Sequence, residues 1–485
     1  MMARASWVVG LASFSAAMIG ATLLSSPAAA QGTVPAALEE RVDEVFARFD
    51  NTRSPGCAVG VVQNGDLILG RGYGMANLEY GLAITPKTVF RIGSVSKQFT
   101  AATIALLAQQ GTISLDADIR EYLPELPTYE RPITVRHLIH HTSGIRDYLV
   151  LMDLTGLRNA DYYSDAEVLE MLARQEELNF LPGDEHLYSN SGYFLLSQIV
   201  LRESGKSLQA YAKEAIFDRL GMTNSHYHDD HNHIVPNRAT GYAPTEAGFR
   251  ISVTQLEMVG DGGVFTTVED LVHWVGNFDE ARVGGASFLE TIHTRGLLTS
   301  GEELGYAFGI VHGEHRGLRT VSHGGSFVGY RADITTYPDE GMDIITLCNV
   351  SDASPTRLAR QVGEVFLEDR MSEPSQSAAR RPRAGRAGRP ETGRVSATDI
   401  VDLVGRYYSP ELDTTYEIVS EAGVVEVHAG RGIDRVVIPA GADTFRAGSL
   451  TLRVERGSQG QVVGLSVDAG RVQHVRFTRM DESLR

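Results

Sequence analysis

Cysteine and positive charge are both scarce in this sequence of 485 residues. The two cysteines, Cys57 and Cys348, lie in β-rich apolar runs, and neither is a credible nucleophile. Lys and Arg number 44 against 61 Asp and Glu, and the formal net charge of −17 argues against a nucleic-acid partner. Internal repeats at solenoid periods are missing. With 42% hydrophobic residues, the chain is long enough for two or three domains, each with its own core.

The N-terminus has the pattern of a secretory signal over residues 1–30. Arg4 precedes an apolar run from about Trp7 to Leu24, and Ala28–Ala30 forms a small-residue cleavage site before Gln31. The alternative is a membrane anchor, although the run is short and interrupted by polar residues. A lipid anchor is not expected, because no cysteine stands at the cleavage point. We therefore expect a secreted protein, most simply in a bacterial periplasm, without stable membrane insertion after cleavage.

The region 31–371 combines strand and helix patterns. Apolar runs at Cys57–Val62 and Leu67–Leu69 predict a strand, a turn and a second strand. Ser94–Gln110 is rich in Ala, Leu and Thr and ends before a glycine, as a buried helix does. Strand patterns return between Gly309 and Val350. Strands at both ends with helices between them predict an α/β sandwich.

Two segments of different composition follow. Residues 372–399 carry prolines and six arginines with few apolar side chains, and predict a flexible linker; binding to an anionic surface is the alternative. Residues 400–485 hold short β-rich runs separated by Gly-containing turns, which predicts a small antiparallel β-barrel. About 85 residues is short for eight strands, so closure of the barrel stays open.

The sequence Ser94-Val95-Ser96-Lys97 is the strongest chemical signal. Residues three apart on a helix share a face, so the Ser94 hydroxyl and the Lys97 amine can meet in one pocket. A serine hydroxyl needs an adjacent base to become a good nucleophile, and a desolvated lysine can be that base. The alternative is a capping serine followed by a solvated lysine.

Two further motifs occur in order along the chain: Tyr188-Ser189-Asn190 and His323-Gly324-Gly325. Together with the first motif they resemble the active-site motifs of the serine beta-lactamase and DD-peptidase superfamily, in its class C-like branch. That branch includes DD-carboxypeptidases, D-aminopeptidases and esterases. The resemblance covers about residues 35 to 370, and Gly405–Tyr408 resembles the start of a C-terminal lipocalin-like barrel.

The resemblance implies roles for these residues. Ser94 would attack a carbonyl carbon and form an acyl-enzyme. Lys97 or Tyr188 would be the general base, and Tyr188 would relay a proton to the leaving group. Asn190 would donate to the substrate amide and fix the Lys97 side chain. The backbone amides of Ser94 and Ser326 would form the oxyanion hole.

Two positions depart from the resembled pattern. His323 stands where many members have lysine, and it would be cationic only in part at neutral pH. Gly324, beside Gly325 in the predicted substrate-binding strand, replaces a hydroxyl residue that often grips a substrate carboxylate. Arg331 would either replace that contact or form a structural salt bridge. Both departures favour a peptidase, aminopeptidase or esterase over an efficient beta-lactamase.

In the resembled fold the first and last strands of the sheet are antiparallel neighbours. A Cys57–Cys348 disulfide is therefore possible in an oxidising compartment, and two separate buried thiols are the alternative.

We expect a serine hydrolase that acts on amide or ester bonds, in D-amino-acid peptides. Its partners would be small peptide or ester substrates, including peptidoglycan fragments or beta-lactams, and it would need no cofactor and no metal. The His- and Asp-rich segment 226–233 resembles a metal site but reads as a loop. The competing functions are a class C-like beta-lactamase and a penicillin- or peptidoglycan-binding sensor that does not turn over.

Overall fold

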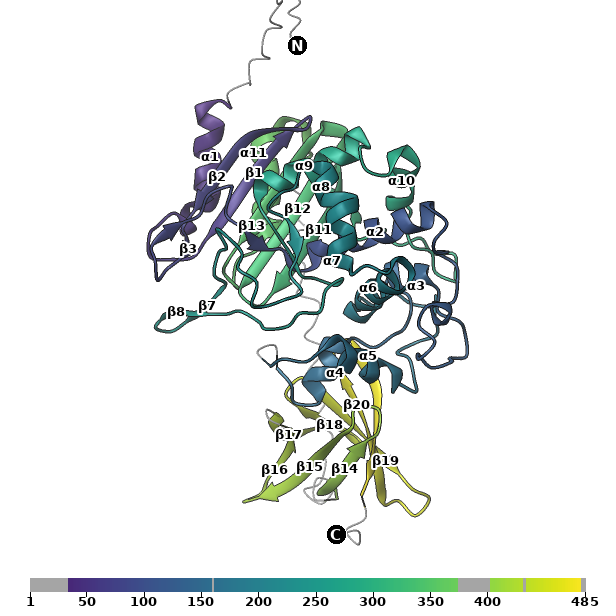
Figure 1. Cartoon of the computed structure of the whole chain (residues 1–485). Helices are drawn as coiled ribbons and strands as arrows, with labels where there is room; N and C mark the ends of the chain where they lie inside the picture. Colours follow the sequence, from purple (N-terminus) through teal and green to yellow (C-terminus); the bar gives the residue numbers. More distant parts are fainter. Residues whose placement is uncertain (1–33, 159–160, 374–401, 431–432, 481–485) are drawn as a thin grey trace, which may run out of the picture. The chain divides into compact units, whose positions relative to one another are not determined.

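The computed structural model describes residues 34–158, 161–373, 402–430 and 433–480 (Figure 1). The predicted signal segment, most of the predicted linker and the last five residues lie outside this part of the chain. The helices have the following bounds: α1 Ala36–Phe46, α2 Lys97–Gln109, α3 Val135–Ile139, α4 Tyr148–Leu154, α5 Asp165–Ala173, α6 Asn190–Ser204, α7 Leu208–Ala212, α8 Asp218–Leu220, α9 Val268–Glu280, α10 Gly285–Ile292 and α11 Pro355–Leu367.

A six-stranded antiparallel sheet, in the order β10-β11-β12-β13-β1-β2, is built from both ends of the region 31–371. Its strands are β1 Cys57–Gln63, β2 Asp66–Tyr73, β10 Val311–His315, β11 Leu318–Phe327, β12 Tyr330–Tyr337 and β13 Met342–Cys348. The inner strands β1 and β13 are buried almost throughout, which explains why neither shows the alternation of apolar and polar residues that is typical of a half-exposed strand.

Two apolar clusters cover the two faces of this sheet. Val59, Val61 and Ile344 point into a cluster shared with α1 and α11, while Ala58 and Ile345 belong to the main core with α2 and α9. Successive side chains of a strand point to opposite faces, so one strand contributes to both clusters. This layering confirms the predicted α/β sandwich.

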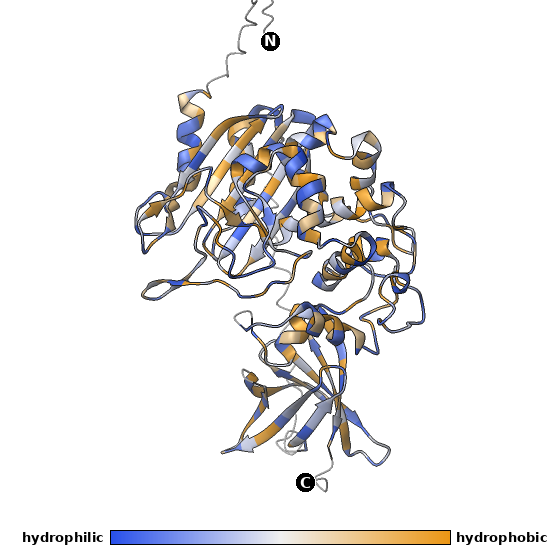
Figure 2. Cartoon of the chain, viewed as in Figure 1, coloured by the Kyte–Doolittle hydropathy of each residue, from blue (hydrophilic) through white to orange (hydrophobic). Residues whose placement is uncertain are grey.

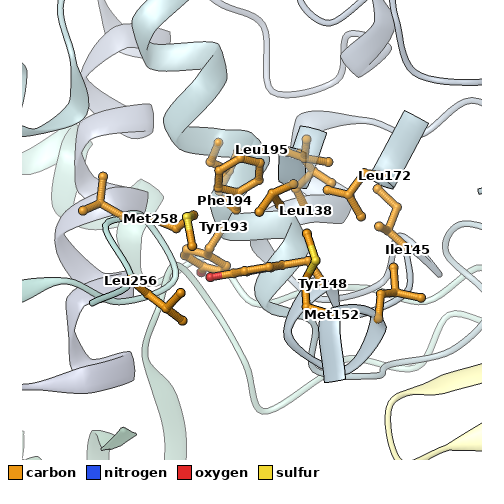
Figure 3. Packing of buried hydrophobic residues seen from close by; sticks show 14 of the residues in the cluster. Leu138, Ile145, Tyr148, Met152, Leu172, Tyr193, Phe194, Leu195, Leu256 and Met258 are labelled. Atoms are coloured by element: carbon orange, nitrogen blue, oxygen red, sulfur yellow. The ribbon is translucent and has the colours of Figure 1, made fainter. Parts of the chain in front are cut away.

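Helix α2 lies inside the main core. Its residues from Lys97 to Leu107 are all buried, so this stretch of the helix has no solvent-facing side. In Figure 2 the apolar colouring runs through the strands of the sheet as well as the helices beside it. Figure 3 shows part of this core, where Tyr148, Tyr193 and Met258 gather between helices.

Short strands complete the region 31–371. They pair as β3 with β4, β7 with β8, and β5 and β6 on either side of β9. Their bounds are β3 Met75–Asn77, β4 Leu82–Ala83, β5 Phe90–Arg91, β6 His226–Tyr227, β7 Tyr242–Thr245, β8 Gly248–Ile251 and β9 Val264–Thr266. Strand β6 begins the His-rich segment, so the expectation of a loop there is wrong at its first two residues.

Cys57 and Cys348 are joined by a disulfide. They are directly opposed partners at the ends of β1 and β13, with their Cα atoms 4.0 Å apart. Of the two alternatives left open by the sequence, the structure has the disulfide. It ties the first strand of the sheet to the last across 291 residues of sequence.

The C-terminal residues form a closed antiparallel barrel of eight strands. Closure comes from the pairing of β14 with β21. The strands are β14 Gly405–Ser409, β15 Thr414–Glu421, β16 Val424–Ala429, β17 Ile433–Gly441, β18 Thr444–Ala447, β19 Leu450–Arg456, β20 Val462–Ala469 and β21 Val472–Arg479. Alternate residues are buried, as in Tyr416 and Ile418 of β15, which gives the mixed colouring of the barrel in Figure 2.

Candidate active site

Ser94 lies in a short 3₁₀ turn, Gly93–Ser96, and helix α2 starts at Lys97. The sequence predicted one helix from Ser94 onward; the tighter turn instead precedes it. The expected juxtaposition is present, since Lys97 Nζ lies 3.3 Å from Ser94 Oγ. Lys97 is fully buried, whereas Ser94 lines a cleft. The pair therefore has the geometry of a nucleophile with its base, and the solvated-lysine alternative is wrong.

Two oxygen atoms fix the Lys97 amine. Its Nζ donates to Asn190 Oδ1 at 2.9 Å and to the backbone carbonyl of Asp261 at 2.5 Å. The same nitrogen lies 4.8 Å from the centre of the Tyr188 ring. The contact with Asn190 was predicted, and the contact with Asp261 was not. A carbonyl acceptor carries no residue-type signal, so no side-chain pattern in the sequence identifies it.

The backbone of Asn190 is held by the carboxylate of Asp147. Asn190 is the first residue of α6, and its backbone N–H donates to Asp147 Oδ2 at 2.8 Å. Ser191 and Tyr148 join the same two segments, because Ser191 Oγ donates to Arg146 O and accepts from Tyr148 N. The start of α6 is thus attached to the loop before α4 (Figure 1).

The Tyr188 hydroxyl is buried and has no hydrogen-bond partner among the described residues. The ring packs against His141, with ring centres 4.1 Å apart, and the residue lines the cleft. Burial lowers the pKa of His141 well below its usual value, with Lys97 as a further cause, so His141 is a neutral packing partner.

His323 is buried and neutral in this site. Burial, followed by the charge of Lys97, lowers its pKa to about 4. Its Nδ1 lies 2.7 Å from Gly324 O, so Nδ1 carries the proton, and Nε2 accepts from the Tyr306 hydroxyl at 3.2 Å. The expectation of partial positive charge at neutral pH is therefore wrong, because the ring itself is buried although its strand borders the cleft. Its ring centre lies 6.3 Å from that of Tyr188.

The predicted oxyanion donors lie on two backbone segments in close approach. A Cβ atom at Gly93 would come within 2.8 Å of Ser326 N, and one at Gly325 would come within 3.2 Å of Ser94 N. Strand β11 pairs with β10 only as far as Ser322, so the edge of β11 beyond it is open toward the turn that holds Ser94. This arrangement leaves two backbone amides next to the nucleophile.

A cleft of about 790 Å³ surrounds these residues. Its lining includes Ser94, Tyr188, Asn190, His323, Gly324, Gly325, Ser326, Arg331, Asp261 and Arg91. Burial raises the pKa of Asp261, whose carboxylate accepts from the Tyr148 hydroxyl at 3.2 Å. Burial lowers the pKa of Arg91, whose guanidinium stacks 5.0 Å from the centre of the Phe327 ring. Sequence reasoning missed both residues.

Arg331 lines the cleft, and within the described part of the chain it forms no salt bridge, which the sequence offered as one alternative. Its Nη1 donates to the backbone carbonyls of Val328 and Tyr330, at 2.9 and 2.6 Å. These contacts hold the guanidinium at the turn between β11 and β12.

One group of side chains in the described part of the chain has the spacing of metal ligands: Asp230, His231 and Glu257. His231 Nδ1 and Glu257 Oε1 lie 2.7 Å apart. None of the three is among the cleft residues, so the group is separate from the candidate active site.

A model of the family described as Beta-lactamase matches residues 38–367. The chain belongs to the beta-lactamase family. A D-aminopeptidase of Gluconobacter oxydans is 29% identical over 343 residues, which cover 70% of this chain and 64% of that protein. A D-aminopeptidase of Cereibacter sphaeroides is 30% identical over 316 residues, covering 64% of this chain and 60% of that protein. The chain thus spans less than two thirds of the length of both relatives.

Solved structures show the same fold at lower identity. The octameric penicillin-binding protein homologue from Pyrococcus abyssi has a TM-score of 0.60 and 23% identity, covering 91% of this chain and 99% of that one. The D-amino acid amidase from Ochrobactrum anthropi SV3 has a TM-score of 0.58 and 19% identity, covering 69% and 99%. These likenesses support the family's fold. Among the described residues, no helix is long and apolar enough to cross a membrane.

Proposed function

We propose that this member of the beta-lactamase family is a serine hydrolase that forms an acyl-enzyme on Ser94 and hydrolyses amide or ester bonds. We propose D-amino-acid amides and peptides as its substrates, of the D-aminopeptidase or DD-carboxypeptidase type. The observation that carries the proposal is the buried Lys97 amine, held by Asn190 Oδ1 and Asp261 O and 3.3 Å from Ser94 Oγ in an open cleft. The names of the D-aminopeptidase relatives support the substrate class.

In the proposed reaction Ser94 Oγ attacks the substrate carbonyl while its proton passes to the unprotonated amine of Lys97 or to the phenolate oxygen of deprotonated Tyr188. The oxygen of the tetrahedral intermediate accepts from the amides of Ser94 and Ser326. Removal of one such donor costs about 3 kcal/mol in other hydrolases. Tyr188, whose hydroxyl has no partner among the described residues, then protonates the leaving group. Water releases the acyl group by the reverse proton path.

The neutral state of His323 favours this assignment over a beta-lactamase. A lysine at this position would bring a fixed positive charge to the substrate-binding strand, and the buried His323, with a pKa of about 4, does not. Gly324 adds no hydroxyl for a substrate carboxylate. Of the two proposed types, these positions favour the D-aminopeptidase type, because an amino acid amide has no carboxylate next to the scissile bond, whereas a DD-carboxypeptidase substrate has one.

The test is turnover of D-phenylalanine p-nitroanilide and its L-enantiomer by the protein and by Ser94→Ala. We expect release of nitroaniline from the D-substrate that is at least 100-fold faster than in Ser94→Ala. Penicillin is the second substrate of the assay. Many rounds of penicillin ring opening would contradict the proposal and indicate a beta-lactamase. A persistent penicillin adduct without turnover of the D-substrate would contradict it and indicate a sensor protein.

We also propose that the protein works in an oxidising compartment, as a secreted protein in a bacterial periplasm. The Cys57–Cys348 disulfide supports this proposal, since such bonds persist outside the reducing cytoplasm. Fractionation of cells that express the whole chain, with N-terminal sequencing of the exported form, tests it. Accumulation of the unprocessed chain in the cytoplasm would contradict it.

A further inference from the structure

The turn between β20 and β21 of the barrel brings an arginine to the wall of the cleft. Arg471 lines the cleft together with Ser94 and Tyr188, and its guanidinium carbon lies 5.6 Å from the centre of the Tyr188 ring. Residues 400–485 therefore contribute a charged side chain to a site whose other described parts come from the region 31–371. The role proposed above for the site does not use this residue.

The backbone around Arg471 is held in place by side chains of the region 31–371, which is called the catalytic region below. Asn179 Nδ2 donates to Arg471 O at 3.0 Å, and Asn179 Oδ1 accepts from Gln473 N at 2.9 Å. Arg146 donates to the carbonyls of Gln473 and His474. Four hydrogen bonds from two side chains thus fix the backbone of the turn, and with it the position of Arg471.

Arg146 adds a buried ion pair to this attachment. Its Nη1 lies 2.7 Å from Glu411 Oε1, and the two side chains are 0% and 5% exposed. A buried ion pair contributes to specificity of arrangement more than to stability, because desolvation offsets the attraction. Arg146 is also the residue directly before Asp147, so the attachment of the barrel and the carboxylate behind Asn190 share one segment of chain.

Three successive contacts lead from Arg471 to the proposed base. Arg471 Nη2 lies 3.3 Å from Asp147 Oδ2, the oxygen that accepts from Asn190 N at 2.8 Å. Asn190 Oδ1 in turn accepts from Lys97 Nζ at 2.9 Å. The Asp147 side chain is 0% exposed, and Arg471 is its charged partner among the described residues. A buried carboxylate needs such a partner, because its charge is otherwise unscreened.

We propose that Arg471 is a positioning residue of the active site, supplied by the barrel. It holds the Asp147 carboxylate, which holds the backbone of Asn190 at the start of α6, and this keeps Asn190 Oδ1 against Lys97 Nζ. The barrel is then a part of the catalytic unit rather than an independent module. This inference rests on the proposed role of Lys97 and Ser94, and not on the identity of the substrate.

If Arg471 only attached the barrel to the catalytic region, its loss would have the same effect as the loss of another ion pair between these two parts. Arg476 of β21 pairs with Glu177 of the catalytic region at 2.7 Å, with both side chains partly exposed. It also joins the barrel to the catalytic region, but it is not among the cleft residues. Arg476→Gln is therefore the matched control, since it removes an ion pair between the same two parts without touching Asp147.

The experiment compares Arg471→Gln, Arg471→Lys and Arg476→Gln in the whole protein, with hydrolysis of p-nitrophenyl acetate as the assay and Ser94→Ala as the background. A misplacement of about 1 Å in a catalytic group costs about 100-fold in rate. We expect Arg471→Gln to lower kcat by about 10- to 100-fold with KM within threefold, Arg471→Lys to recover part of this loss, and Arg476→Gln to keep the rate of the unchanged protein.

Hydrogen exchange of the Asn190 amide is the second readout, and it needs no turnover. We expect faster exchange at Asn190 in Arg471→Gln and unchanged exchange in Arg476→Gln. If Ser94→Ala is as active as the unchanged protein, the proposed function fails, while exchange at Asn190 still decides the role of Arg471. Unchanged exchange at Asn190 in Arg471→Gln, or equal rate losses in the two Gln variants, would overturn the inference.

Discussion

Gly325 offers the sharpest test of the oxyanion geometry, through the substitution Gly325→Ala. A Cβ atom at this position would lie 1.9 Å from the carbonyl oxygen of Ile92 and 3.2 Å from Ser94 N. An ordinary carbon–oxygen contact is about 3.4 Å, so β11 and the turn that holds Ser94 must separate by about 1.5 Å. The neighbouring Gly324 has room, since its nearest atoms would be Thr356 Oγ1 at 3.4 Å and Asp333 Oδ2 at 3.6 Å.

Two costs follow from that separation. Overpacking of this kind destabilises a folded protein by about 1–3 kcal/mol. A displaced Ser326 amide no longer reaches the developing oxyanion, and the loss of one such donor costs about 3 kcal/mol, or about 100-fold in rate. We therefore expect Gly325→Ala to remain folded at reduced stability and to acylate Ser94 at least 100-fold more slowly.

The first assay is the pre-steady-state burst of nitrophenol from p-nitrophenyl acetate, with the ester in excess. The second assay is unfolding in urea. Gly324→Ala is the stability control and should unfold within about 0.5 kcal/mol of the unchanged protein, as expected where no contact is strained. Gly276→Ala, in α9, has no atom within 4 Å of the added carbon and serves as the distant control. A Gly325→Ala protein with unchanged burst rate and unchanged stability would refute the close approach of the two segments.

Two further predictions concern stability. The pKa of His323 is about 4 in the folded protein and 6.5 in the unfolded chain. As the pH falls, the unfolded chain therefore takes up a proton first, which favours unfolding. The contribution of His323 to the free energy of unfolding is fully present above about pH 6.5 and falls by up to about 3 kcal/mol as the pH drops to 4. His323→Gln should flatten this part of the urea-unfolding profile, and an unchanged slope would contradict the neutral buried ring. Reduction of Cys57–Cys348, which closes 291 residues, should cost about 6 kcal/mol by the chain-entropy model. Equal unfolding midpoints for oxidised protein and Cys57→Ser/Cys348→Ser would show that the bond contributes nothing.

Local sequence patterns were sufficient to predict those features that depend on a single short segment of the chain. The spacing of Ser94 and Lys97 predicted their contact, because it depends on the helical repeat of one short segment. The apolar runs of β1 and β13 predicted buried strands, and their pairing placed Cys57 opposite Cys348. The repeated β-rich runs after residue 400 predicted a barrel, but its closure stayed open because closure depends on pairing between the first and last strands.

Features that depend on three-dimensional burial were not predictable from one sequence. His323 was expected to carry partial charge, and only the packing around its ring shows that it is neutral. The acceptor for Lys97 is the backbone of Asp261, which any residue type would offer. Arg471 is 374 positions from Lys97 in sequence, and no local pattern connects a barrel turn with Asp147.

The most direct test of the central claim is the mass of the intact protein during hydrolysis of a slowly deacylated ester, followed by peptide mapping. The account predicts a transient increase equal to the mass of the acyl group, located on Ser94 and absent from Ser94→Ala. An adduct on another residue, or equal turnover by Ser94→Ala without any adduct, would contradict it.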